Sequence, residues 1–297
     1  MIILPCMKRP DLDAVGGSMA FAEYLQRQGK AAKVWLGDTP DGEARFYLEE
    51  FSISNLATLE EVKQAEEFQL VDLSRAEALP DFIDLGLVTK VIDHRFLHDA
   101  EKDFPNAVIE LEQVGAAATQ VTEYFIKANL IPTEISASML YGAIYSNTLC
   151  LKGAVTTERD RDVAEWLKKH SPDCDRYCDG QLLARKQDIL DNLYDAISLE
   201  RKTYILEDGI YGFTQFELIE GTEFWQEHKD FICHALDAQP ERSLLNIIDL
   251  SKNVSLVYSN DDDLLKRLEN TFNMPSTDKK FQLDPALMRK QIAKLLE

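Results

Sequence analysis

Short apolar runs alternate with helical patterns through the first half of the chain. The apolar runs are MIILP (1–5), AAKVWL (31–36), FQLVDL (68–73), LVTKVID (87–93) and NAVIEL (106–111). They are short enough for buried strands and rich in residues that favour them. Strands that alternate with helices at this spacing form βαβ units. The pattern therefore predicts an α/β fold in which the N-terminal domain is a doubly wound parallel sheet.

Four helices are predicted among and after these strands. The first runs from about Ala14 to Gln28 and is ended by Gly29, because glycine readily adopts the conformation that terminates a helix. A later segment, SASMLYGAIY, is apolar nearly all round, which predicts a buried helix. The three later helices are expected at 113–128, 134–151 and 157–170.

The pattern changes in the second half of the chain. After a polar helix near 181–198, the segment KTYILEDGIYGFTQFEL has two strand-like runs around Asp208-Gly209, which predicts a hairpin. A helix near 222–237, the strands LLNIIDL (244–250) and VSLVYS (254–259), and two closing helices follow. We therefore expect two domains, residues 1–185 and 186–297, of which the second is smaller and mixed α/β.

The balance of charge narrows the range of partners. The 297-residue chain has 52 acidic and 32 basic residues, which gives a formal net charge of −20. Proteins that bind nucleic-acid backbones need a broad positive surface, so no nucleic-acid partner is expected. An anionic substrate would have to meet a local positive site, either a metal ion or a few basic side chains.

No membrane segment or disulfide framework is expected. The start of the chain, MIILPCMKRP, is not a signal peptide, and no later run approaches the roughly 18 apolar residues of a membrane span. The five cysteines are odd in number and contain no CxxC pair, which argues against disulfides and a structural zinc site. We expect a cytoplasmic protein.

Acidic residues follow three of the five predicted strands. Asp11 and Asp13 come after the first strand, Asp72 closes the third, and Asp93 with His94 closes the fourth. Taken singly, each Asp is explained by helix capping or turn formation. Ligands of open parallel sheets, however, bind at the carboxyl ends of the strands. Carboxylates gathered there repel one another unless a cation or protons neutralise them.

The cluster therefore predicts a divalent metal site. Oxygen ligands with one imidazole suit Mn²⁺ or Mg²⁺, with Co²⁺ or Zn²⁺ as substitutes in vitro. A carboxylate that bridges two ions suits two-metal phosphoryl chemistry. Asp72, in the middle of the strand order, is the best candidate for such a bridge.

Several ordered motifs resemble a known superfamily. RPDLDAVGG, LVDLS, VIDHRFLH, VGAAATQVTEYF and LYGAIYSNTLCLKGAVTTERDRD occur in the order and approximate spacing of the DHH phosphoesterases. The chain looks most like family II (manganese-dependent) inorganic pyrophosphatases and the related exopolyphosphatase and prune-type proteins. LERKTYILEDGIYGFTQFEL and LMRKQIAKLLE are similar to the DHH-associated second domain, so the resemblance covers essentially the whole chain.

The resemblance implies an activity and a site. A metal-activated hydroxide would hydrolyse phosphoanhydride bonds of pyrophosphate or short polyphosphate, in a cleft between the two domains. The cofactor would be one or two Mn²⁺ ions, or Mg²⁺ or Co²⁺. A homodimer formed through the sheet edge of the first domain would fit the family.

Individual residues fall on the family's functional positions. Asp11, Asp13, Asp72 and His94 match metal ligands, and Asp93 matches the acid that orients the imidazole.

Basic residues of the second domain match the family's phosphate-binding positions. They are Lys202, Arg289 and Lys290, the last two within a motif whose register can slip by one residue. Without the resemblance, the terminal segment MRKQIAKLLE would be explained as the solvated end of an amphipathic helix.

Three positions depart from the family pattern. Met7 replaces a histidine, Asn147 replaces an aspartate, and Arg95 replaces the second histidine of the signature. Asn147 can still offer a carbonyl oxygen to a metal but brings no charge. Arg95 either binds a phosphate oxygen or pairs with Asp93 or a neighbouring acid. We therefore expect looser metal binding than in a typical pyrophosphatase, or one ion instead of two.

Two alternatives remain open from the sequence. One is a catalytically impaired homologue that binds a phosphate or nucleotide ligand or a partner protein, for which Met7 and Asn147 are the support. The other is a nuclease or cyclic-dinucleotide phosphodiesterase of the same superfamily. It is disfavoured because the second half lacks the glycine-rich pattern of the RNA-binding members.

Overall fold

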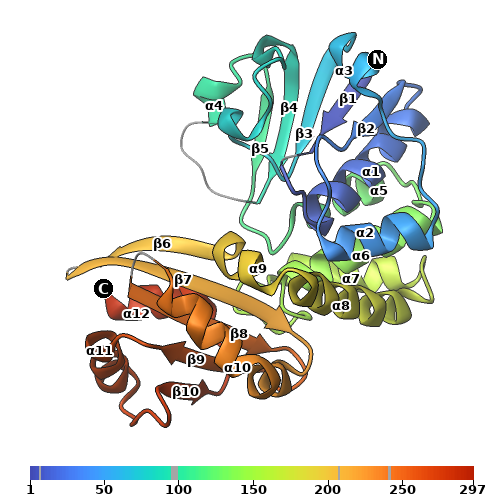
Figure 1. Cartoon of the computed structure of the whole chain (residues 1–297). Helices are drawn as coiled ribbons and strands as arrows, with labels where there is room; N and C mark the ends of the chain where they lie inside the picture. The colour runs from blue at the N-terminus through green and yellow to red at the C-terminus, as the bar shows by residue number, and fades with distance from the viewer. Residues whose placement is uncertain (7, 95–99, 207, 240–241) are drawn as a thin grey trace. The chain divides into compact units, whose positions relative to one another are not determined.

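The computed structural model describes residues 1–297 apart from 7, 95–99, 207, 240 and 241. The chain divides into two compact units, Met1–Arg185 and Lys186–Glu297. Each unit has a five-stranded sheet of its own (Figure 1). No helix in the described ranges is long and apolar enough to cross a membrane.

The sheet of the first unit is parallel throughout, as the sequence predicts, and has the order β2-β1-β3-β4-β5 (Figure 1). The strands are β1 (Ile2–Pro5), β2 (Ala32–Trp35), β3 (Glu67–Val71), β4 (Val88–Asp93) and β5 (Val108–Leu111). The strand order reverses between β1 and β3. In doubly wound sheets, ligands bind at this switch point, beyond the carboxyl ends of the strands.

Apolar side chains cover both faces of this sheet. Leu4 and Val71 belong to the core on the face of α1, α5 and α6, whereas Ile3 and Leu70 belong to a second core on the opposite face. Successive residues of a strand point to opposite faces, so the continuous apolar runs fill both cores.

The helical elements of the first unit and of the chain that follows it are α1 (Leu12–Arg27), α2 (Gly42–Glu50), α3 (Leu59–Lys63), η1 (Ala76–Ala78), η2 (Leu85–Leu87), α4 (Ala100–Asp103), α5 (Ala117–Lys127), α6 (Glu134–Asn147), α7 (Glu158–Lys168) and α8 (Cys174–Asp191). Helix α6 is buried on nearly every side, as its sequence predicts. Helices α2 and α3 were not predicted, because they are short and α2 carries polar residues on much of its surface.

Several predicted helix ends were wrong. Helix α5 begins at Ala117, not near residue 113. Helix α6 ends at Asn147, four residues before the predicted end at 151, because residues 149–151 all adopt left-handed backbone conformations. The single helix predicted at 181–198 is two helices, α8 and α9 (Leu193–Leu199), separated at Asn192, which has non-helical backbone angles.

The second unit has a mixed sheet in the order β10-β9-β8-β7-β6. Its strands are β6 (Arg201–Leu206), β7 (Gly209–Leu218), β8 (Arg242–Asp249), β9 (Val254–Ser259) and β10 (Lys280–Leu283), and its remaining helices are α10 (Gly221–Asp237), α11 (Asp262–Phe272) and α12 (Arg289–Leu296). Strands β6 and β7 pair antiparallel as the predicted hairpin, and β7 and β8 are parallel. The four-residue strand β10 was not predicted.

Two apolar cores flank the second sheet. Phe216 and Leu245 pack with α9 and α10 on one face, whereas Phe213 and Leu244 pack with α11 and α12 on the other. We call the face that packs with α11 and α12 the α12 face.

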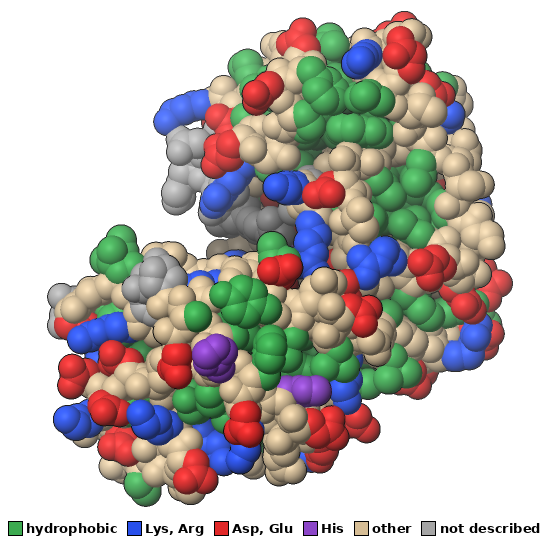
Figure 2. Space-filling view, in the orientation of Figure 1, with side chains coloured by type: hydrophobic (Ala, Val, Ile, Leu, Met, Phe, Trp, Pro, Cys, Tyr) green, Lys and Arg blue, Asp and Glu red, His purple; other side chains and the backbone are tan. Residues whose placement is uncertain are grey.

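On the surface drawn in Figure 2, acidic and basic side chains are interspersed, and the described Lys and Arg residues do not gather into a continuous patch.

Candidate metal centre

Three of the predicted site residues converge at the carboxyl edge of the first sheet. Asp13 lies in the first turn of α1, Asp72 directly follows β3, and His94 directly follows β4. One ligand atom from each lies within 4.8 Å of the others. His94 Nε2 is 3.4 Å from Asp72 Oδ1 and 3.8 Å from Asp13 Oδ2. We call these three residues the metal group.

The backbone places Asp72 at the sheet edge in an unusual conformation. Its φ is +56°, in the left-handed region that residues with a side chain rarely adopt. Its N–H donates to the carbonyl oxygen of Ile92 at 2.8 Å, so the residue stays attached to β4. Such backbone strain concentrates at functional sites.

Asp13 is buried and held by three donors. The N–H of Ala118 donates to its Oδ1 at 2.8 Å, and the N–H of Ala117 donates to its Oδ2 at 2.8 Å. Asn147 Nδ2 donates to the same Oδ2 at 2.7 Å. Because the first N–H groups of a helix have no partner within it, Asp13 satisfies two of those of α5 and lies at its positive end.

The environment of Asp13 raises its affinity for protons. The net effect of its surroundings raises the pKa of the carboxyl to about 6: burial raises it most, the charge of Asp11 also raises it, and His94 and the two N–H donors lower it. A bound cation would oppose the effect of burial, because it favours the charged form.

His94 presents Nε2 to the two carboxylates. Its Nδ1 lies 3.3 Å from the carbonyl oxygen of Val114, an arrangement in which a proton on Nδ1 leaves Nε2 to act as a ligand. Asp93, to which the resemblance gives the orienting role, accepts a hydrogen bond from Ser74 Oγ at 2.6 Å, and Gln120 Nε2 donates to its backbone oxygen. The orienting role of Asp93 stays a prediction.

A buried carboxylate outside the metal group supports the loop that leads into α5. Asp160, which caps α7 together with Thr157, accepts hydrogen bonds from the N–H of Gly115 at 2.9 and 3.0 Å and from Thr119 Oγ1 at 2.6 Å. A Cβ at Gly115 would lie 2.4 Å from Thr148 Cγ2, so the close approach requires glycine. The sequence showed only the capping spacing of Thr157 and Asp160, so this contribution was missed.

The other predicted site residues of the first unit do not belong to the metal group. Asp11 is the N-cap of α1 and accepts from the N–H of Ala14 at 3.0 Å; it is not a member of the metal group. Asn147 reaches the site through its amide nitrogen, as a donor to Asp13. Arg95 lies outside the described residues, as does Met7.

Three of the predicted phosphate-binding residues belong to the second unit. Lys202 lies on β6 opposite Phe213, a residue of the α12 face, and Arg289 and Lys290 open α12. The guanidinium of Arg289 donates to the carbonyl oxygen of Glu200 and contacts the hydroxyl of Tyr204. Since alternate strand residues share a face, Lys202 lies on the same face as Tyr204 and α12.

The donor set of the metal group fits a hard divalent cation. Two carboxylates and one imidazole nitrogen are ligands that Mn²⁺ accepts readily. The two carboxylates together carry two negative charges when ionised, which one divalent ion would balance. The metal group is therefore able to hold an ion. Among the other described residues, Asp11 and Asn147 could hold that ion or lie next to it.

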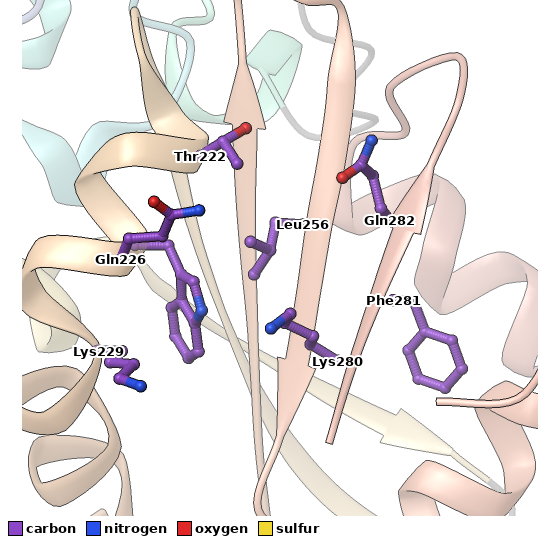
Figure 3. A pocket seen from close by; sticks show the side chains of 8 residues that line it. Thr222, Gln226, Lys229, Leu256, Lys280, Phe281 and Gln282 are labelled. Carbon is purple, nitrogen blue, oxygen red and sulfur yellow. The ribbon is translucent and has the colours of Figure 1, made fainter. Parts of the chain in front are cut away.

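Cavities also lie outside the metal group. One, of about 590 Å³, is lined by residues that follow β1, β2 and β3, including Cys6, Lys8, Asp38 and Leu79. It therefore opens at the same sheet edge as the metal group. A smaller one, of about 230 Å³, lies between α10 and strands β9 and β10 of the second unit (Figure 3). None of the predicted site residues lines it.

Comparison with curated proteins finds manganese-dependent pyrophosphatases. The chain is 24% identical to a Clostridium acetobutylicum protein named "Probable manganese-dependent inorganic pyrophosphatase", over 96% of this chain and 93% of that one. Proteins of the same name from Deinococcus radiodurans and Streptococcus thermophilus are 31% and 34% identical over 53% and 54% of this chain. Those two matches cover only about half of each relative, 50% and 53%. No family model matches the chain.

Solved structures share the fold over the whole chain. A Methanococcus jannaschii protein assigned to the family II inorganic pyrophosphatases superposes with a TM-score of 0.68 at 21% identity, covering 100% of this chain and 98% of that one. An exopolyphosphatase-related protein from Bacteroides fragilis superposes with a TM-score of 0.54 at 13% identity, covering 99% of this chain and 89% of that one. The family resemblance seen in the motifs and the fold class predicted from the apolar pattern are confirmed.

Proposed function

We propose that this chain, a homologue of the manganese-dependent family II inorganic pyrophosphatases, is a metal-dependent hydrolase of phosphoanhydride bonds in pyrophosphate or short polyphosphate. The single observation that carries the proposal is the convergence of Asp13, Asp72 and His94 at the switch point of a parallel sheet. The relatives' names supply the substrate class and the metal.

The metal group would hold Mn²⁺, with Mg²⁺ or Co²⁺ as substitutes. A divalent ion there would lower the pKa of a water molecule and stabilise negative charge on a phosphoryl oxygen. The chain's own residues prepare the site. Asp13 and Asp72 offer buried carboxylate oxygens, Val114 orients His94, and the start of α5 holds the carboxylate of Asp13 in place.

Basic residues would bind the substrate's phosphates. Lys202, Arg289 and Lys290 are proposed for this role because they match the family's motif and share one face of the second sheet. Arg95 is included on the motif alone. An arginine can donate two parallel hydrogen bonds to a phosphate, which orients the group as well as binding it.

The proposal extends to partners and location. The substrate is a small phosphate anion and not a nucleic acid, because the chain carries a net charge of −20. A homodimer and a cytoplasmic location belong to the same proposal, on the strength of the family resemblance.

A panel of substrates tests the activity. Metal-stripped protein refilled with Mn²⁺ should release phosphate from pyrophosphate and tripolyphosphate and should leave a short oligonucleotide intact. Cleavage of the oligonucleotide in preference to pyrophosphate would favour the nuclease alternative. An absence of turnover with Mn²⁺, Mg²⁺ and Co²⁺ would favour the impaired homologue.

A further inference from the structure

The start of helix α12 is held by three polar side chains of the second sheet. The carbonyl oxygen of Leu287 accepts from Asn246 Nδ2 at 2.7 Å and from Ser255 Oγ at 3.0 Å. The N–H of Leu287 donates to Ser255 Oγ at 2.9 Å, and the N–H of Arg289 donates to Gln215 Oε1 at 2.6 Å. Three adjacent strands thus bind the backbone of the two residues that flank the helix start.

Gln215 and Asn246 form a buried amide pair on the α12 face. They lie opposite each other on β7 and β8, and Asn246 Nδ2 donates to Gln215 Oε1 at 3.1 Å. Their exposed fractions are 5% and 0%. The Oδ1 atom of Asn246 is buried and has no hydrogen-bond partner among the described residues.

Packing alone does not account for this pair. The neighbours on the α12 face include Phe213, Leu244 and Val257, so apolar residues at both positions would continue the core. Buried amide groups cost stability unless they are hydrogen-bonded, and one oxygen here is left unsatisfied. What the amides do provide is a fixed attachment for the backbone that leads into α12.

We propose that Gln215 and Asn246 are positioning residues that fix the start of α12 and thereby aim Arg289 and Lys290 at substrate phosphate. The inference rests on the phosphate-binding role given to these two residues in the proposed function. The N–H of Arg289 is itself bound to Gln215, so the Arg289 side chain leaves the backbone from a fixed point. A helix start that is no longer held would let the Arg289 guanidinium move away from the phosphate that it is proposed to bind.

Apolar variants of the pair test the proposal in the full chain loaded with Mn²⁺. Gln215→Leu and Asn246→Leu should each raise KM for pyrophosphate about tenfold and change kcat less than about threefold, because ground-state binding is lost. Gln215→Glu combined with Glu217→Gln keeps an acceptor for the N–H of Arg289 and preserves the hydrogen bond that Gln215 Nε2 makes to Glu217 Oε1 at 2.6 Å, so KM should stay near the wild-type value.

A matched control separates positioning from general stability. Thr214→Val removes a buried hydrogen bond of the same strand, from Thr214 Oγ1 to the carbonyl oxygen of Ile197 at 2.9 Å, on the opposite face. It should lower Tm and leave KM unchanged. If Gln215→Leu and Asn246→Leu also lower Tm and leave KM unchanged, the proposal is overturned.

A double variant tests whether Gln215 acts through Arg289. In a Lys290→Ala background, where Arg289 is the one residue of the pair left to aim, adding Gln215→Leu to Arg289→Ala should weaken pyrophosphate binding no further. Additive effects would contradict the proposal.

Calorimetric binding of pyrophosphate distinguishes this inference from the proposed function. If the wild-type protein binds pyrophosphate without hydrolysing it, and Gln215→Leu weakens that binding, the hydrolase proposal fails and the positioning role stands. If the wild-type protein does not bind pyrophosphate, both are overturned.

Discussion

At the scale of single residues, the neutral amide of Asn147, which is hydrogen-bonded to Asp13, limits the negative charge of the metal centre. An amide that donates to Asp13 Oδ2 at 2.7 Å adds no negative charge and occupies one side of that oxygen. Asp13 and Asp72 alone supply carboxylates to the metal group. Together they balance one divalent ion, so we expect one bound Mn²⁺ per chain.

Asn147→Asp should change both stability and stoichiometry. In metal-stripped protein the new carboxylate would face Asp13 without a donor between them, and the free energy of unfolding should fall by about 1–3 kcal/mol. Bound Mn²⁺ should rise from one ion per chain to two. Thermal unfolding without metal and elemental analysis of the refilled protein would measure these effects.

Asn147→Ser is the matched control, because it removes the amide without adding charge. It should still bind one ion. A wild-type protein that already holds two ions, or an Asn147→Asp protein that still holds one, would contradict this account of the site.

At the scale of elements, the metal centre depends on how α5 and α7 begin. Asp160 of α7 accepts a hydrogen bond from the N–H of Gly115. Two and three residues further along the chain, the N–H groups of Ala117 and Ala118 donate to Asp13. A carboxylate in one helix therefore positions the loop that presents donors to a carboxylate in another.

Asp160→Asn should weaken both folding and metal binding. The replacement sets an amide NH₂ against donors, which should reduce the free energy of unfolding by about 3 kcal/mol. Mn²⁺ affinity should fall about tenfold, as for other groups that support metal ligands. Denaturant unfolding and Mn²⁺ titration would measure these effects. Asp162→Asn, an exposed position of the same helix, should change neither; if it matched Asp160→Asn, the loop would not be the cause.

The N-cap of α2 should make stability depend on pH. Asp41 accepts from the N–H of Ala44 at 2.8 Å, and burial, with the charges of Glu43 and Asp11, raises the pKa of its carboxyl to about 8. A raised folded-state pKa means that the native protein binds more protons than the unfolded chain. The contribution of Asp41 to stability is therefore lost as pH rises from about 4 to about 8.

Asp41→Asn should remove this pH dependence. Asn is also a good N-cap, so the helix start is kept. The variant's gain in the free energy of unfolding should be small near pH 4 and should grow by at most about 1.4 kcal/mol per pH unit up to pH 8. Denaturant unfolding of metal-stripped protein at several pH values measures it. A gain that is constant with pH would refute the assignment.

At the scale of the whole molecule, the parallel sheet was predictable because its strands and helices have local hydrophobic patterns that can be recognised in the sequence. Strands buried on both faces give continuous apolar runs, such as those containing Leu4 and Leu70, and helices separate them. The ends of α5 and α6 were not predictable, because hydrogen bonds to Asp13 and left-handed residues after Thr148 determine them. Asp13 is distant in sequence from α5, and the left-handed residues after α6 are Leu149, Cys150 and Leu151, with no glycine to mark them in the sequence.

The metal group was predictable for a related reason. Parallel strands bring their carboxyl ends to one edge, so the acids that follow β1 and β3 and the histidine that follows β4 are expected near each other. The supporting residues could not be found in the same way. Val114 contributes a backbone oxygen, and Asp160 reaches the loop from a later helix.

Whether the metal group holds the catalytic ion can be measured directly by a Mn²⁺ titration of metal-stripped wild-type protein and Asp72→Asn, with bound ion and phosphate release from pyrophosphate recorded together. If it does, turnover in the wild-type protein rises in parallel with the binding of Mn²⁺. Asp72→Asn, while still folded, then loses both. Mn²⁺-dependent turnover that survives undiminished in Asp72→Asn would contradict the assignment of the metal centre.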